Sequence, residues 1–209
     1  MANWAITNYV IEGPKEDLQK IYDAIKVHDV ENGSSEDWEG NILNALGIDW
    51  ERHNVERQDD GKIECSGLYM RGFIYDEPEL DLNKEVLSFM CEEAWGLTDF
   101  RIPLREHFPE ITVYWQVEEE GCDVFATNDE EGKYFPERYY IDVYIKDEDN
   151  QDCFFDDSEY FSDKEEALMW LSEKTNGKVK SKEDIAKFNE EHETGEQFIS
   201  WHEYTVEED

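Results

Sequence analysis

The sequence has little positive charge for its length of 209 residues. Its 19 lysines and arginines face 55 aspartates and glutamates, which gives a formal net charge of -36. Affinity for nucleic-acid phosphates needs clusters of lysine and arginine, so we expect no direct binding of DNA or RNA. We likewise expect no attraction to anionic membranes, and we expect a basic protein surface as the partner.

Paired cysteines, a leader segment and long apolar runs are missing as well. Cys65, Cys91, Cys122 and Cys153 stand far apart and form no CxxC pair, so a zinc ribbon is not expected. The first ten residues lack the basic and apolar regions of a signal peptide. No apolar run approaches the roughly 20 residues that span a bilayer. We therefore predict a cytoplasmic protein with free thiols.

Catalytic and metal-binding motifs are also absent. The five histidines are scattered, without the spacing of a metal site, at His28, His53, His107, His192 and His202. No motif supports Cys91 and His107 as a nucleophile and its base. The acidic stretch from Asp147 to Asp152 lacks the glycine of an EF-hand loop. We therefore predict no catalytic residue, no cofactor and no metal site, and hence no enzyme.

The residues that are abundant indicate an ordered chain. Hydrophobic residues make up 39% of the sequence and aromatic residues 14%, with seven tryptophans spread along its length. Such a composition can fill a core and argues against disorder despite the high net charge. The acids occur throughout the chain and are somewhat denser in its C-terminal part.

Apolar periodicity predicts both strands and helices. Strands are predicted over residues 3–11, 111–118, 122–127, 138–146 and 198–206, and helices over 14–25, 35–46, 98–107, 162–176 and 181–188. Residues 63–74 fit a strand or a bent hairpin, because Gly67 and Gly72 interrupt their alternation. Residues 86–92 fit a strand or a short helix, and the strand is favoured, with Leu87, Phe89 and Cys91 facing inward. Ser35 is the predicted N-cap of the second helix, and Ser162 with Glu165 forms a predicted capping box. Residues 49–61 and 147–157 are predicted loops.

This order of elements predicts an α+β fold. Its core is a ferredoxin-like split β-α-β arrangement, extended by further antiparallel strands and by added C-terminal helices. Residues 1–127 are predicted to form the ferredoxin-like α+β domain. Residues 128–209 are predicted to form an acidic α+β part packed on it, or one continuous domain with it.

Short motifs in the first 127 residues resemble a known family. They are Ala2-Asn3-Trp4, Ile11-Glu12-Gly13, Leu87-Ser88-Phe89, Glu93-Ala94-Trp95, Phe108-Pro109 and Glu119-Glu120-Gly121. Together they are similar to the YubB-type ferredoxin-like proteins of plasmids, phages and conjugative elements, although Glu93 stands where that family usually has threonine. The resemblance implies a fold and a mobile-element context, and it implies no enzymatic activity.

The acids suggest a first hypothesis for function. A rigid, strongly negative surface could imitate the phosphates of DNA, and so bind and inhibit a nucleic-acid-binding host enzyme such as a restriction or CRISPR nuclease. The residues predicted to bind this partner are Glu118, Glu119, Glu120, Asp129, Glu130, Glu131, Asp147, Glu148, Asp149, Asp152, Asp156, Asp157 and Glu159. The aromatic residues between 139 and 161 fit either a core or anchors at such an interface.

Two other functions stay open. The chain could be an acidic accessory or adaptor protein, as a monomer or a homodimer, whose charge serves solubility. It could also be a small enzyme, for which a deep pocket lined by a histidine and a carboxylate would be the sign. An uneven distribution of surface charge would favour mimicry, and a uniform one the accessory function.

Overall fold

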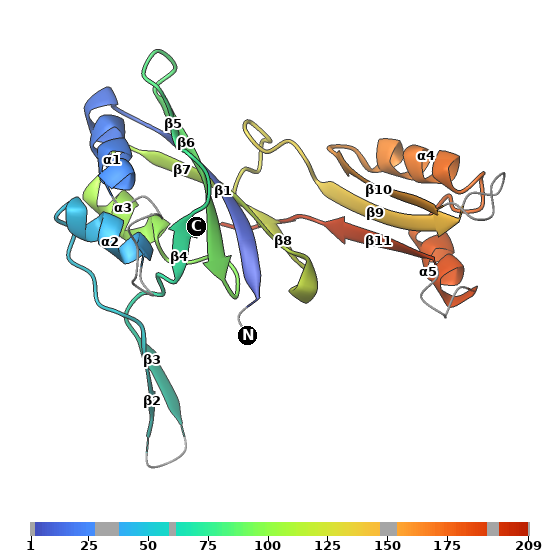
Figure 1. Cartoon of the computed structure of the whole chain (residues 1–209), viewed down its shortest axis with the longest axis horizontal. Coiled ribbons are helices and arrows are strands. Elements are labelled where there is room, and N and C mark those ends of the chain that lie inside the picture. Colours follow the sequence, from blue (N-terminus) through green and yellow to red (C-terminus); the bar gives the residue numbers. More distant parts are fainter. Residues whose placement is uncertain (1–2, 28–37, 59–61, 147–153, 192–196, 209) are drawn as a thin grey trace. The chain divides into compact units, whose positions relative to one another are not determined.

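The computed structural model describes residues 3–27, 38–58, 62–146, 154–191 and 197–208. Contacts along the chain divide it into two compact units, which we call unit 1 (Met1–Asn128) and unit 2 (Asp129–Glu208). The sequence predicts a boundary after residue 127. The elements of both units are labelled in Figure 1, and the protein is a mixed α and β structure, as its periodicity predicts.

Unit 1 is built on an antiparallel sheet whose order is β8-β7-β1-β6-β4, with β5 also paired to β6. The strands are β1 (Trp4–Glu12), β4 (Gly72–Ile74), β5 (Glu79–Asp81), β6 (Val86–Ala94), β7 (Thr112–Glu119) and β8 (Val124–Thr127). The central strand β1 pairs with β6 on one side and with β7 on the other. The strand that was favoured over residues 86–92 is thus confirmed and extends to Ala94.

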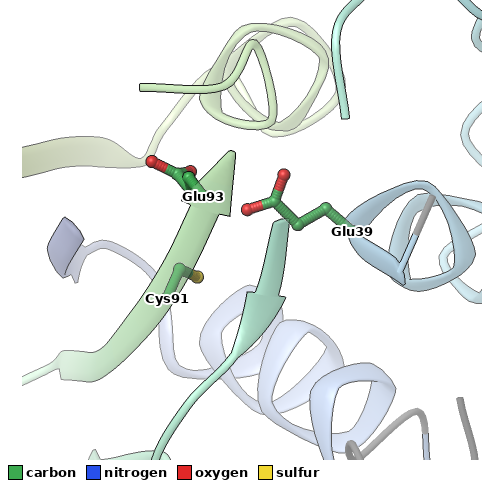
Figure 2. Close-up of side chains that lie close together, drawn as sticks. All are labelled: Glu39, Cys91 and Glu93. Carbon is green, nitrogen blue, oxygen red and sulfur yellow. The ribbon is translucent and has the colours of Figure 1, made fainter. Parts of the chain in front are cut away.

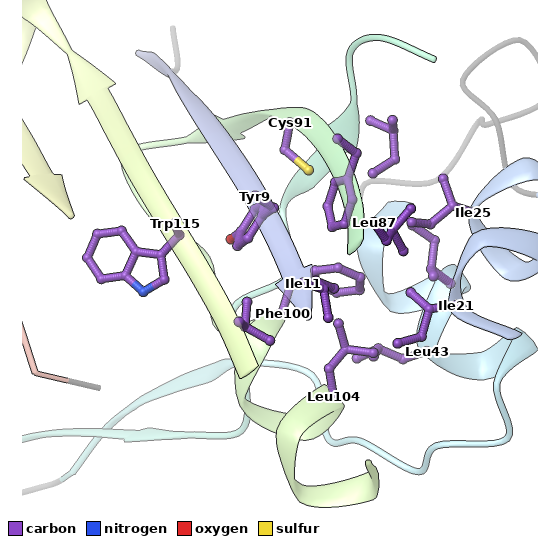
Figure 3. Packing of buried hydrophobic residues seen from close by; sticks show 14 of the residues in the cluster. Tyr9, Ile11, Ile21, Ile25, Leu43, Leu87, Cys91, Phe100, Leu104 and Trp115 are labelled. Atoms are coloured by element: carbon purple, nitrogen blue, oxygen red, sulfur yellow. The ribbon is translucent and has the colours of Figure 1, made fainter. Parts of the chain in front are cut away.

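Three helices cover one face of this sheet, as Figure 1 shows. They are α1 (Lys15–Val27), α2 (Trp38–Ala45) and α3 (Arg101–His107), and a short 3-10 turn, η2 (Glu120–Cys122), follows β7. Alternate residues of β1 point toward the helices, because successive side chains of a strand lie on opposite faces. Tyr9 and Ile11 are therefore buried against Phe89 and Leu87, their direct neighbours on β6. Figure 3 shows this core.

One predicted loop of unit 1 contains a strand. Residues 49–61 were expected to be a loop, but β2 (Asn54–Arg57) pairs there with β3 (Ile63–Ser66) in a hairpin. Every side chain of the two strands is exposed. With no buried face, the hairpin has no alternation of apolar and polar residues, which is the signal that sequence reasoning uses.

Unit 2 has a three-stranded antiparallel sheet of order β10-β9-β11. Its elements are β9 (Tyr139–Lys146), β10 (Phe154–Phe161), α4 (Lys164–Lys174), α5 (Lys182–Glu191) and β11 (Phe198–Glu203), followed by β12 (Thr205–Val206). Ile141 and Val143 of β9 pack in one core with Leu171 of α4 and Phe188 of α5. Both helices thus cover the same face of the sheet. No helix of the described ranges is long and apolar enough to cross a membrane.

Strand β10 corrects a second loop prediction. The loop was predicted to reach residue 157, but β10 already begins at Phe154 and pairs with β9 along its whole length. Its central residues, Asp156 to Glu159, are all polar and so gave no strand signal. Backbone pairing with β9 decides the conformation here, whereas the side chains do not. The rest of that predicted loop, residues 147–153, lies outside the described residues, as does Ser35, the predicted cap of α2.

The cap of α4 is also different from the predicted one. Asp163, in an extended conformation, is the N-cap, and its side chain accepts hydrogen bonds from the backbone N–H groups of Glu165 and Glu166, at 2.8 and 3.1 Å. Aspartate is among the strongest N-cap residues, because its oxygen satisfies otherwise unpaired N–H groups and its charge suits the positive helix end. Ser162 therefore has no role as the cap.

Substitution of these two neighbours tests the assignment. We expect Asp163→Ala to lower the free energy of unfolding of unit 2 by about 1 kcal/mol, the usual cost of losing an N-cap. Ser162→Ala, the matched control, should change it by less than about 0.5 kcal/mol. Urea denaturation followed by circular dichroism measures both, and the reverse order of effects would restore Ser162 as the cap.

Candidate functional site

The acids predicted to bind a partner are divided between the two units. Glu118 and Glu119 end β7 and Glu120 begins η2 in unit 1, and all the others belong to unit 2. Those that are exposed in the structure are Glu120, Glu130, Glu131, Asp156 and Glu159, while Glu118 and Asp157 are half-buried. Asp147, Glu148, Asp149 and Asp152 lie outside the described residues.

Two of the acids predicted to bind a partner are buried, and so they are not part of the surface that a partner contacts. Asp129 is 2% exposed and Glu119 is 4% exposed. The Asp129 carboxylate accepts hydrogen bonds from the backbone N–H groups of Lys133, Tyr134 and Phe135, at 3.0, 2.6 and 2.9 Å. Although burial opposes ionisation, these hydrogen bonds hold the pKa of Asp129 below its ordinary value. Asp129 thus orders a turn and offers no carboxylate to a partner.

Among the described residues of unit 2, no helix covers the second face of its sheet, and we call this face the open sheet face. Residues directly opposite one another in antiparallel strands share a face, and the odd-numbered residues of β9 face the helices. The even-numbered ones therefore lie on the open sheet face together with their partners on β10 and β11. Its described side chains are Tyr140, Asp142, Tyr144, Asp156, Ser158, Tyr160, Phe198, Ser200 and His202.

Aromatic rings form two rows across the open sheet face. Tyr140 lies between Tyr160 and His202, with ring centroids 4.7 and 5.9 Å away. Tyr144 stacks on Phe198 at 6.0 Å. Tyr160 and Phe198, at the outer ends of these rows, are 43% and 40% exposed. Large aromatic side chains held on a rigid sheet and open to solvent are typical anchors of a protein interface.

The negative charge of unit 2 is concentrated outside its two helices. The segment of the two helices, residues 164–191, contains six lysines and seven acids, which are Lys164, Lys174, Lys178, Lys180, Lys182 and Lys187 with Glu165, Glu166, Glu173, Glu183, Asp184, Glu190 and Glu191. The helical layer is thus nearly neutral. The nine described side chains of the open sheet face include the carboxylates of Asp142 and Asp156, and Lys146 continues the even-numbered register of β9. Most of the negative charge of unit 2 therefore lies outside its helices.

A different cluster, fully buried, lies in unit 1. Glu39 of α2 reaches over the end of β4 toward Glu93 of β6, and Cys91 lies two residues before Glu93 on the same strand face, as Figure 2 shows. One carboxylate oxygen of each glutamate and the Cys91 sulfur lie within 4.8 Å of one another. All three side chains are 0% exposed. No described ion pair involves either glutamate, so the cluster has two carboxyl groups without a counter-cation.

Hydroxyl groups surround Glu93. Tyr9 donates to Glu93 Oε1 at 2.8 Å, and Thr7 donates to Glu93 Oε2. The Thr98 hydroxyl lies 2.8 Å from Glu93 Oε1 and 2.7 Å from Glu39 Oε2. A hydroxyl has a single proton to donate, so it cannot donate to both carboxyl groups at once. Both contacts are satisfied when Glu39 is protonated and donates to Thr98, which in turn donates to an ionised Glu93.

Electrostatics point to the same protonation state. Burial, and then the nearby charge of Glu93, raise the pKa of Glu39 well above its ordinary value. Burial and the two glutamates also raise the pKa of the Cys91 thiol. Two full negative charges no more than 4.8 Å apart would repel by at least about 3 kcal/mol at an effective dielectric constant of roughly 20. Without a cation, one proton shared within the pair removes this repulsion.

Sequence reasoning missed this cluster, although its pattern contains two signals. Glu93 continues the inward alternation of Leu87, Phe89 and Cys91 along β6, and so an acid occupies a core position. Glu39 lies on the same helical stripe as Leu43 and Leu46, at spacings of four and seven residues. Among 55 acids, neither position stood out, because the distance between α2 and β6 is set only by the fold.

One described groove of unit 1 contains a histidine and a carboxylate but does not bury them. A groove of about 550 Å³ there is lined by Lys20, Asp23, Ala24, Val27, Ala45, Leu46, His107 and Phe108. It contains a histidine and a carboxylate, but Asp23 and His107 are both exposed. Active sites shift acids and bases by burying them, and these two side chains are not buried. Cys91 is fully buried and does not line this groove.

Comparison with known proteins identifies no relative. No family model matches the chain, and no match was found among curated proteins or among solved structures. The resemblance to YubB-type proteins therefore stays an expectation.

The buried carboxyl pair predicts a specific pH dependence of stability. The pKa of Glu39 is raised in the folded state. The contribution of Glu39 to the free energy of unfolding is therefore fully present below its ordinary pKa of 4.5 and is lost as the pH rises through its folded-state pKa. Glu39→Gln imitates the protonated acid. We therefore expect its stability, relative to the unsubstituted protein, to increase between pH 5 and pH 8, by up to about 1.4 kcal/mol per pH unit.

Glu93→Gln is the contrasting variant. It replaces an acceptor of hydroxyl groups by an amide whose N–H₂ group cannot accept, and we expect a loss of about 2–4 kcal/mol. Urea denaturation in the presence of a chelator, at both pH values, measures both variants. If Glu39→Gln is less stable than the unsubstituted protein at pH 8, the assignment of the proton to Glu39 is wrong.

Proposed function

We propose that this protein is a non-enzymatic binding protein that docks on the basic, nucleic-acid-binding surface of an enzyme and inhibits it by imitating DNA. The observation that carries the proposal is the asymmetry of unit 2. The segment of its two helices is nearly neutral, so most of its negative charge lies elsewhere, and the open sheet face combines the carboxylates of Asp142 and Asp156 with exposed aromatic rings. A directed negative surface suits a basic partner better than evenly spread charge does.

Aromatic rings and carboxylates have different tasks in this proposal. Tyr160 and Phe198 supply apolar area for the centre of an interface, where aromatic anchors contribute most of the binding energy. Asp142 and Asp156 lie on the same face and occupy the place of phosphates. The exposed acids Glu130, Glu131 and Glu159 extend the negative charge within unit 2. Long-range attraction then accelerates association and makes it sensitive to salt.

We also propose that unit 1 has a ferredoxin-like core of the YubB type. The order β7-β1-β6-β4, with α1 and α2 between β1 and β4 and α3 between β6 and β7, is the order that a split β-α-β pattern requires. This order supports the fold that the short motifs suggested. The mobile-element context that the resemblance implies is in keeping with a host enzyme as the target.

An acidic accessory function is the second candidate, and one observation favours it. Exposed acids also occur in unit 1, as on the β2–β3 hairpin, where Glu56 and Glu64 face solvent. Charge over both units would serve solubility without any specific partner. The two functions differ in whether the open sheet face binds.

A competition experiment separates them. The protein is used to capture partners from host lysate at low salt, and the captured enzyme is purified and titrated with labelled duplex DNA. We expect the protein to displace the DNA, with an affinity that falls steeply as salt rises. Simultaneous binding of DNA and protein would rule out mimicry, and no salt-dependent partner at all would favour the accessory function.

Variants then locate the interface. We expect Tyr160→Ala and Phe198→Ala each to weaken binding by about 30-fold, as loss of an aromatic anchor does. Asp142→Asn with Asp156→Asn should lower the association rate and flatten its salt dependence. The matched control is Glu165→Gln with Glu173→Gln, which removes the same charge from exposed positions of α4. Equal effects of the two double variants would show that only net charge matters.

A further inference from the structure

The buried cluster of unit 1 has the side chains of a metal site. Carboxylate oxygens and a cysteine sulfur are the protein ligands of zinc and of similar divalent transition-metal ions. Glu39, Cys91 and Glu93 bring one such atom each to within 4.8 Å of the others. They come from α2 and from two positions of β6 that face the same side, so the fold itself assembles the set.

An unsatisfied oxygen is the second observation. Glu39 Oε1 is buried and accepts no hydrogen bond from the described residues. A buried polar atom of this kind is costly, by about 1–3 kcal/mol, unless some other group satisfies it. Protonation of Glu39 at Oε2 leaves this oxygen still without a partner. A cation in the cluster would give it one and would also supply the missing positive charge.

Gly72 makes room for this carboxylate. It lies on β4 directly opposite Glu93. A Cβ atom at this position would come within 2.5 Å of Glu39 Oε1 and 2.9 Å of Glu39 Oε2. Any other residue would therefore push the Glu39 carboxylate away from Cys91 and Glu93. The Glu39 side chain occupies space that only a glycine leaves.

We propose that Glu39, Cys91 and Glu93 bind one divalent transition-metal ion of the zinc type. Bound at the usual distances of about 2.0–2.3 Å, such ligand atoms lie roughly 3.5 Å apart, so the three side chains need to close in by about an ångström. A tetrahedral ion has a fourth position, which water or the Thr98 hydroxyl fills. Thr7, Tyr9 and Thr98 already hydrogen-bond to the glutamates and orient them as outer partners.

The site is buried, so the ion enters as the chain folds. The test therefore refolds the full chain from urea with Co²⁺, in a form in which Cys65, Cys122 and Cys153 are serine and Cys91 is the single thiol. We expect one tightly bound Co²⁺ per chain, with the near-ultraviolet absorption of a cobalt–thiolate bond, and its loss on addition of Zn²⁺. The melting temperature should rise with bound Zn²⁺.

Two variants show whether the buried cluster binds the Co²⁺ ion. Glu39→Gln keeps the shape of the protonated acid, and Gly72→Ala keeps every ligand but displaces Glu39. In the same single-thiol form, both should weaken Co²⁺ binding by at least about 100-fold, the upper end of the effect of losing an outer partner. Glu16→Gln, a change to an exposed acid in α1, is the matched control and should leave the affinity unchanged.

Two results would overturn the proposal. One is a folded single-thiol protein without cobalt–thiolate absorption, since Cys91 is then not a ligand. The other is the same absorption and affinity in Glu39→Gln as in the parent. Weak binding by surface acids gives no thiolate absorption and counts as the first result. Neither result bears on the binding of a partner by unit 2.

Discussion

The antiparallel pairing of β1 with both β6 and β7 is the constraint on which unit 1 depends. It brings Tyr9 opposite Phe89 on one side and opposite Trp115 on the other, and so aligns the buried residues of three strands in rows. The same register places Thr7 beside Cys91 and Ala5 beside Glu93. The core and the buried carboxyl pair therefore arise from one set of backbone hydrogen bonds, and a shift of one residue would turn both toward the other face.

Acids serve opposite purposes in the two units. In unit 1, Glu39 and Glu93 are buried. Hydroxyl groups, together with a proton or a cation, offset the free-energy cost of burying the two carboxyl groups. In unit 2, Asp142 and Asp156 lie on the open sheet face, where we propose that a basic partner binds. Asp129 has a third role, since its carboxylate orders a turn. Net charge alone does not distinguish these roles, because burial decides what each carboxylate does.

Strongly alternating segments could be predicted from the sequence, and polar ones could not. The strand from Thr112 to Glu119 and the helix from Lys15 to Val27 have one apolar face, which periodicity detects. The β2–β3 hairpin has few apolar residues, and the centre of β10, from Asp156 to Glu159, has none, so backbone pairing decides the conformation of both. The choice of Asp163 over Ser162 as a cap depends on which of the two is extended at the helix start, and local sequence allows both.

The sequence by itself determined a charged, ordered chain of mixed helices and strands, because composition and periodicity are local properties of the chain. It also indicated an inward face for Leu87, Phe89 and Cys91, on which Glu93 follows. Only the tertiary structure decided that Glu39 meets Glu93 over Gly72, and that the helices of unit 2 cover one face of its sheet and leave the other open. Such contacts join residues far apart in the chain, and the packing of α2 on the sheet, rather than any sequence spacing, sets their distance.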